Sequence, residues 1–254
     1  MNHHELLHIA TLIGQRLLEN GAEIYRVEES VERIIKAYGV DEVHVYAVVN
    51  TIIVSITLPD HTCLSKTVRI RIRQTNLDRI NYLNHMSRQM VLRQPTYEES
   101  LYELNHILAR PVYSLKMEMF AYALTSSTFA LFFGGTLNDA LCAFMIGPLL
   151  RLASHYLGSL KTNPFFTTIT CSFIAGVFSI LLTYFSIGEN YDKIIIGIIM
   201  NLVPGVALTN AVRDLIAGDT IAGQSKLIEA ILTATCIAIG TGSAVSMIPL
   251  FMSF

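Results

Sequence analysis

The chain has 254 residues, of which 52% are hydrophobic and 15% charged, and its mean hydropathy is +0.47. This composition is too apolar for an ordinary soluble domain. The net charge is −2 and no basic block is present, which excludes nucleic-acid binding by electrostatic capture of phosphates. The four cysteines are isolated in the sequence and predict neither a zinc site nor a disulfide framework.

Charged residues are concentrated at the beginning of the chain. Residues 1–116 hold 13 of the 18 Lys and Arg residues and 13 of the 20 Asp and Glu residues. We therefore predict a cytoplasmic α+β domain over residues 1–115, followed by an all-α membrane domain over residues 116–254. The polar N-terminus has no signal-peptide pattern, so we expect the first domain to stay in the cytoplasm.

Helical spacing of apolar residues predicts two helices at the start of the chain, over Glu5–Leu18 and Ala22–Tyr38. His4 and His8 would share a face of the first helix. They lack a third ligand, so no metal site is predicted.

A period of two then replaces the helical period. Val43–Val49, Ile52–Leu58 and Val68–Ile72 are predicted strands of a sheet with one wet face. Capping-box patterns at Thr75 and Thr96 predict two more helices after the sheet.

Five apolar runs downstream are long enough to cross a bilayer about 30 Å thick. They are Met117–Phe133, Leu137–Leu157, Phe165–Ile187, Ile194–Ala211 and Leu227–Phe251. With the N-terminus inside, Lys and Arg near the helix ends favour the inner side by five to one, and the C-terminus is then outside. The inner set is Lys116, Arg151, Lys161, Arg213 and Lys226, and the outer residue is Lys193.

Polar residues in and after the fourth run form the main candidate site for substrate or ions. Two stripes share one helix face because their members are four positions apart. The first stripe is Asn201, Gly205, Thr209 and Arg213, and the second is Asn210 and Asp214, with Asp219 following. Pro204 and Gly205 predict a kink or break, as in the broken helices of transporters. Ordinary helix packing, with residues 213–219 in a cytoplasmic loop, explains the same pattern equally well.

Two more polar residues of the apolar half are secondary candidates. Asp139 lies at the start of the second run, where anchoring at the interface is the simpler interpretation. Arg151 lies toward its inner end, where the side chain can reach the headgroups.

Two motifs resemble the signatures of the bacterial threonine/serine exporter family. They are Gly21-Ala-Glu23-Ile-Tyr-Arg26-Val-Glu28-Glu29 and Pro204-Gly205-Val-Ala-Leu-Thr209-Asn210-Ala-Val-Arg213-Asp214-Leu-Ile-Ala-Gly218-Asp219. The chain is similar to the larger, N-terminal-half subunit of the split members. The resemblance implies a location in the bacterial cytoplasmic membrane, a small multi-spanning membrane partner and export of threonine and serine, or of succinate in one split pair.

The leading hypothesis is export of a small hydroxy amino acid, driven by the proton-motive force. Arg213 and free N–H groups beyond Pro204 would bind the carboxylate, and Asp214 or Asp219 the ammonium group. Thr209 and Asn210 would bind the side-chain hydroxyl, and a buried aspartate would carry the proton. The few spans also favour a homo-oligomer or a partner subunit enclosing the pathway.

Three alternatives remain open. A dicarboxylate exporter would need more positive charge in the membrane half. A membrane-tethered hydrolase would use Glu23, Arg26, Glu28 and Glu29, although acidic residues in a first helical turn are expected from the helix dipole alone. A ligand sensor would bind its ligand in the first domain. We predict no catalytic residues and no cofactor.

Overall fold

The computed structural model describes residues 1–111, 113–160 and 162–247. The chain forms two compact units, each built from two stretches of sequence. The first unit contains residues 1–111 and 205–228, and the second contains 112–204 and 229–254. The predicted boundary at residue 115 puts residues 205–228 in the membrane domain, whereas in the structure this segment packs with the first unit.

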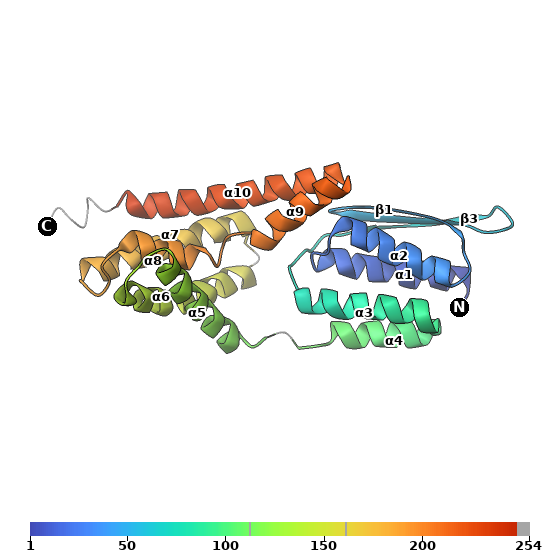
Figure 1. The fold of residues 1–254 in the computed structure, drawn as a ribbon, viewed down its shortest axis with the longest axis horizontal. Coiled ribbons are helices and arrows are strands. Elements are labelled where there is room, and N and C mark those ends of the chain that lie inside the picture. The colour runs from blue at the N-terminus through green and yellow to red at the C-terminus, as the bar shows by residue number, and fades with distance from the viewer. Residues whose placement is uncertain (112, 161, 248–254) are drawn as a thin grey trace. The chain divides into compact units, whose positions relative to one another are not determined.

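The first unit has a small sheet covered on one face by two layers of helices (Figure 1). The sheet has three antiparallel strands in the order β1 (Glu42–Val48), β2 (Thr51–Thr57) and β3 (Cys63–Arg69). Helices α1 (His3–Glu19) and α2 (Ile24–Ala37) pack on it, and α3 (Leu77–Arg93) and α4 (Tyr97–Leu108) form the outer layer. Helix α9 (Gly205–Ala217) and the start of α10 (Thr220–Val245) complete the unit.

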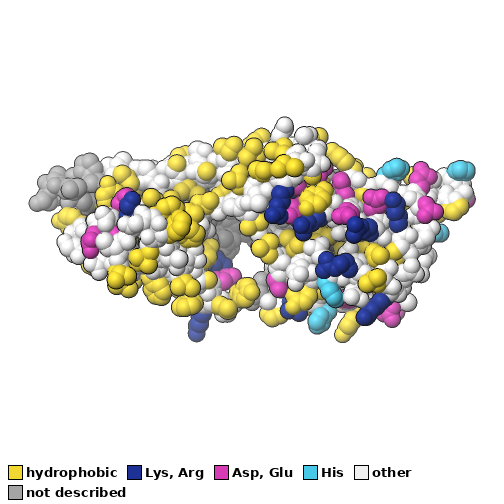
Figure 2. Space-filling view, viewed as in Figure 1, with side chains coloured by type: hydrophobic (Ala, Val, Ile, Leu, Met, Phe, Trp, Pro, Cys, Tyr) yellow, Lys and Arg dark blue, Asp and Glu magenta, His cyan; other side chains and the backbone are white. Residues whose placement is uncertain are grey.

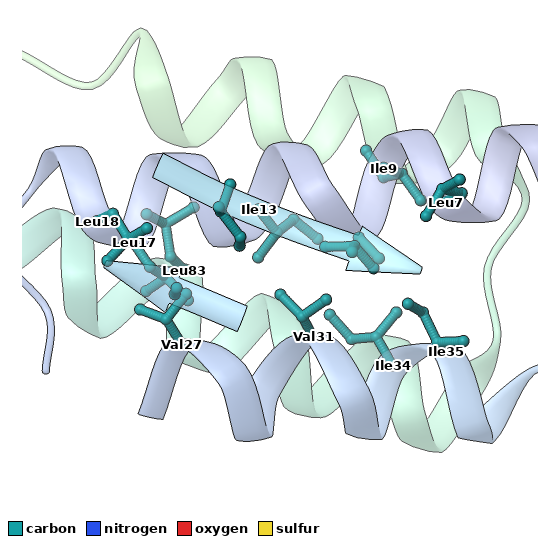
Figure 3. Packing of buried hydrophobic residues seen from close by; sticks show 14 of the residues in the cluster. Leu7, Ile9, Ile13, Leu17, Leu18, Val27, Val31, Ile34, Ile35 and Leu83 are labelled. Atoms are coloured by element: carbon teal, nitrogen blue, oxygen red, sulfur yellow. The ribbon is translucent and has the colours of Figure 1, made fainter. Parts of the chain in front are cut away.

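The core of this unit follows directly from the two hydrophobic periods. Ile52, Val54 and Ile56 alternate along β2 and are fully buried. The apolar stripe of α2 meets that of α1, and Figure 3 shows Val27 and Val31 pointing toward the helix that carries Ile13. Burial of these aliphatic side chains stabilises the unit.

The third strand lies earlier in the sequence than predicted. It spans Cys63–Arg69, because a tight turn with His61 in the left-handed region reverses the chain after β2 and Thr57 pairs with Cys63. Val68–Ile72 was predicted as the strand, but only its first two residues belong to β3 and Ile72 is exposed. At the next helix Asn76, not Thr75, is the N-cap, whereas the capping box of Thr96 and Glu99 is confirmed.

The second unit is all helical. It contains α5 (Leu115–Phe132), α6 (Leu137–Ser159), α7 (Pro164–Tyr184), α8 (Tyr191–Ile199) and the rest of α10. Helix α5 packs closely against α6 and α8 at two glycines: a Cβ on Gly147 would lie 2.6 Å from the Tyr122 carbonyl oxygen, and one on Gly197 the same distance from the Ser126 carbonyl oxygen. Small residues thus let these helices approach one another.

The predicted fold class is wrong in two respects. The chain is mostly helical, with one three-stranded sheet among the described residues, so α+β overstates its strand content. Three described helices, not about five, are long and apolar enough to cross a membrane, namely α6, α7 and α10.

Two of the predicted spans are not long and apolar enough in the structure, for physical reasons. The first run forms α5, which has 18 residues and carries Lys116 and Glu118 in its first turn. The fourth run is divided: α8 has nine residues and α9 has 13, with the break at 200–204 that Pro204 predicts. Part of the fifth run, 248–251, lies outside the described residues, as does Lys161 of the inner basic set.

Candidate functional site

The two sequence motifs meet in the first unit, where α9 contacts the beginning of α2. Asn210 donates a hydrogen bond from Nδ2 to the Gly21 carbonyl oxygen at 3.0 Å, and Arg213 donates to Glu23 Oε1 at 2.8 Å. The backbone N–H of Ile24 donates to Asp214 Oδ1 at 3.1 Å. We call these residues, with Lys226, the α2–α9 clasp. Four of the predicted candidates, Glu23, Asn210, Arg213 and Asp214, are thereby brought together.

Asp214 is the buried centre of the clasp. Its side chain is 0% exposed, and its Oδ2 accepts a hydrogen bond from Lys226 Nζ at 2.7 Å. Lys226 is itself only 12% exposed and also lies 3.4 Å from the Ala22 carbonyl oxygen. A buried charge is tolerated when it is paired and hydrogen-bonded, and both conditions hold here.

Asp214 also supplies a cap that α2 lacks locally. Glu23 is the N-cap of α2, and its side chain makes no capping hydrogen bond. The first N–H groups of a helix need acceptors, and a carboxylate at this end interacts favourably with the helix dipole. A residue 190 positions away therefore fills the role that Ser or Asp usually has at the N-cap itself.

Glu23 lies between two arginines. Besides Arg213, its carboxylate faces Arg26 Nε at 3.5 Å. The Glu23 side chain is nearly buried, whereas both arginine side chains are about half exposed. The arginines thus keep free surface with which to contact another anion.

Two further carboxyl groups, those of Glu28 and Asp219, lie near the clasp. Glu28 Oε1 accepts a hydrogen bond from the Ala47 N–H at 2.7 Å, and Asp219 lines a cavity of about 100 Å³ with Ala47 and Gly218. Burial raises the pKa of both carboxyl groups, and the neighbouring charge of Asp219 raises that of Glu28 further. These two groups are therefore the best placed in the clasp region to bind a proton.

Thr209 and Gly205 stay outside the clasp contacts. Thr209 is exposed, and its hydroxyl donates to the Gly205 carbonyl oxygen within α9 at 2.9 Å. Nothing lies within 4 Å of a Cβ built on Gly205, so this glycine is not required by close packing.

The remaining candidates, Asn201, Asp139 and Arg151, belong to the second unit. Asn201 donates from Nδ2 to Ser126 Oγ at 2.8 Å. Asp139 is fully buried and accepts hydrogen bonds from the backbone N–H groups of Glu189 at 2.7 Å and Asn190 at 2.9 Å. It thereby ties the start of α6 to the α7–α8 connection and is not a free carboxylate at the membrane interface.

The Arg151 side chain, predicted to reach toward the headgroups, contacts a side chain of the neighbouring helix. Its guanidinium group donates to Glu118 Oε2 at 2.9 Å from Nε and 2.5 Å from Nη2. Both side chains are partly buried. Arg151 of α6 is therefore ion-paired with Glu118 of α5.

Sequence inspection missed three partners: Lys226, Ser126 and Glu118. Lys226 directly precedes the fifth apolar run and Glu118 lies at the start of the first, and a charge at the edge of an apolar run is the signal that could have found them. Ser126 carries no such signal. No group of three His, Cys, Asp or Glu residues able to hold a metal ion occurs in the described ranges.

Comparison with known proteins gives a consistent result across nearly the whole chain. A family model described as "Putative threonine/serine exporter" matches residues 8–248. A "Threonine/serine exporter" of Corynebacterium glutamicum is 21% identical over 95% of this chain, which spans 51% of that protein's length.

Two shorter relatives match as well. Proteins of Klebsiella aerogenes and Escherichia coli K12, each named "Probable succinate transporter subunit YjjP", are 25% identical over 88% and 89% of this chain. The matches cover 87% and 89% of those proteins. No solved structure matches the chain.

Proposed function

Because the chain belongs to the threonine/serine exporter family, we propose that it is a subunit of a two-component exporter that moves small hydroxy amino acids out of the cytoplasm. The observation that carries this proposal is the family match over residues 8–248, which includes both motifs. The chain is thus a membrane protein of a transport family, and the resemblance inferred from its motifs is confirmed. An enzymatic role for the Glu23 region has no support from the relatives.

The partner is proposed from the relatives and from the number of spans. Two relatives of comparable length are named as subunits, whereas the chain spans half of the longer exporter. The described residues include only three candidate spans, which is few for enclosing a pathway. A second membrane protein, or further copies of this chain, would complete the wall of a pathway.

For the substrate we favour a zwitterion over a dicarboxylate. The described part of the second unit holds few cations: Arg151 is paired with Glu118, Lys193 lies 3.3 Å from Asp192, and Lys116 is exposed at the start of α5. A dianion crossing this unit would need more positive charge. The alternative cargo, succinate, is favoured by the names of two relatives.

The contacts support the following proposed roles within the site. Asn210 and Asp214 hold α9 against α2, while the exposed groups of Thr209 and Arg213 remain available to a substrate. Asp219, with Glu28 beside it, is our candidate for the coupled proton because its pKa is raised. Asn201 and Ser126 are the candidate polar contact in the second unit.

Efflux tests the proposal directly. Cells without endogenous exporters are preloaded with labelled threonine, serine or succinate, and express this chain with or without its candidate small partner. Release of threonine or serine only when both proteins are present is the expected result. Release of succinate alone would change the proposed substrate to a dicarboxylate. No release of any of the three compounds, with both proteins shown to be in the membrane, would refute the proposal.

The same assay tests the proton site. Asp219→Asn should abolish export at an unchanged amount of folded protein, because the amide cannot cycle between charged and neutral forms. Export equal to that of the unsubstituted chain would remove Asp219 from the mechanism.

A further inference from the structure

A groove between α2 and α3 is a cavity that no proposed role explains. It lies within the first unit and has a volume of about 560 Å³. Cavities that bind small organic molecules have volumes of roughly 300–1,000 Å³. The groove is therefore large enough for a metabolite and larger than an inorganic ion requires.

The lining of the groove is rich in arginine. Arg26 and Arg33 reach it from α2 and Arg88 from α3, and Glu29 is its one acidic residue. Arg33 is paired with Glu29 and Arg26 faces Glu23, whereas no ion pair of Arg88 is found within the described residues. Figure 2 shows Lys and Arg side chains gathered on the face of this unit in view, between Asp and Glu side chains.

The existing ion pairs are weak competitors for a ligand. Arg33 is paired with Glu29 at 2.5 Å across one helical turn, and both side chains are more than half exposed. Exposed pairs of this kind contribute about 0–1 kcal/mol. A ligand carboxylate that contacts a guanidinium group through both of its oxygens can displace such a pair, since bidentate charge-assisted contacts are the stronger ones.

Other groups indicate an organic ligand. Asn84 and the buried Ser87 add polar groups to the lining, and Val91 adds an apolar side chain. We propose that this groove binds a small organic dianion, with Arg33 and Arg88 contacting its carboxylates. The proposal goes beyond the transport function and does not depend on which molecule is exported.

The groove is linked to the α2–α9 clasp through one side chain. Arg26 lines the groove and also faces Glu23, which binds Arg213 of α9. A dianion in the groove competes with Glu23 for Arg26 and leaves Glu23 to Arg213. Because such coupling is reciprocal, the state of the clasp also changes the affinity of the groove.

Calorimetric titration of the purified full-length chain with succinate tests the inference in the absence of transport. The titration is done at constant ionic strength, with the neutral analogue succinamide as the comparison. We expect saturable binding of succinate, weakened about tenfold or more in Arg88→Gln and in Arg33→Gln, and no binding of succinamide.

Arg93→Gln is the matched control, since Arg93 is an exposed arginine of the same helix that does not line the groove. It should leave the affinity unchanged. Absence of saturable succinate binding, equal binding of succinamide, or equal weakening by the Arg93 and Arg88 substitutions would each overturn the inference. Efflux and binding are measured separately, so failure of one does not imply failure of the other.

Discussion

Asp214 carries the contact on which the clasp depends. Its two oxygens serve different partners: one accepts from the Ile24 N–H of α2, and the other binds Lys226 of α10. Removing one member of a buried pair leaves the other charge without compensation, which is more costly than losing an exposed pair. Asp214 therefore has a structural role that is independent of any role in transport.

Asp214→Ala should lower the free energy of unfolding by about 3–5 kcal/mol, because Lys226 stays buried without its partner and α2 loses its cap. Thermal unfolding of the purified protein in detergent measures the change. Asp192→Ala is the control: Asp192 is paired with Lys193 but more than half exposed, so its loss should cost no more than about 0.5 kcal/mol.

The double variant Asp214→Ala/Lys226→Met separates the two contributions. It should recover part of the lost stability, because the buried cation is gone while α2 remains uncapped. Equal unfolding temperatures for Asp214→Ala and Asp192→Ala would contradict this account of the clasp.

At the level of elements, the sequence predicted most helices and two of three strands, since their apolar residues have clear periods of 3.6 or two. The third strand was predicted too late in the sequence, because its start is determined by the turn after β2 and not by the alternation of apolar residues. The membrane half was harder, since an apolar run shows neither where a helix breaks nor whether it is long enough to span.

The sequence predicted that polar residues of α9 share a helix face, but not what that face contacts. The polar stripe of Asn210 and Asp214 was identified correctly as one helix face. Its partners, Gly21 and Ile24, lie about 190 positions away, and no local pattern relates them. A polar stripe in a sequence therefore does not show whether its residues pack against another helix or bind a ligand. That distinction requires the residues that contact the stripe in the structure.

Close helix packing in the second unit gives a prediction at this scale. Gly147→Ala should destabilise the packing of α6 on α5 by about 1–3 kcal/mol, because the added methyl group would lie 2.6 Å from the Tyr122 carbonyl oxygen. The loss of stability is measured by heating the purified protein and determining, by size-exclusion chromatography, the fraction that stays monodisperse.

Gly158→Ala is the control in the same helix, where nothing lies within 4 Å of the added Cβ. It should be neutral or stabilising by up to about 1 kcal/mol, since alanine is the better helix former. If the two variants lose stability equally, the close approach of α5 and α6 is not as described.

On the scale of the whole molecule, the chain contains a natural reporter of membrane orientation. Cys63 of β3 is exposed, whereas Cys142, Cys171 and Cys236 are buried. With the first unit in the cytoplasm, as we propose from the distribution of Lys and Arg, a membrane-impermeant maleimide should label Cys63 in inside-out vesicles but not in intact cells.

Cys63→Ser serves as the control for this labelling and should abolish it. Labelling of Cys63 in intact cells would place the first unit outside and reverse the proposed direction of substrate entry.

The division of the first unit into two stretches of sequence also has a consequence for synthesis of the protein. Residues 1–111 leave the ribosome first, and residues 112–204 follow before α9 and Lys226 can arrive. At about 5–20 residues per second, this interval lasts roughly 5–20 s. For that time α2 has no cap and the position of Ala222 in the core is empty, so the nascent chain must remain incompletely folded until nearly all of it has been translated.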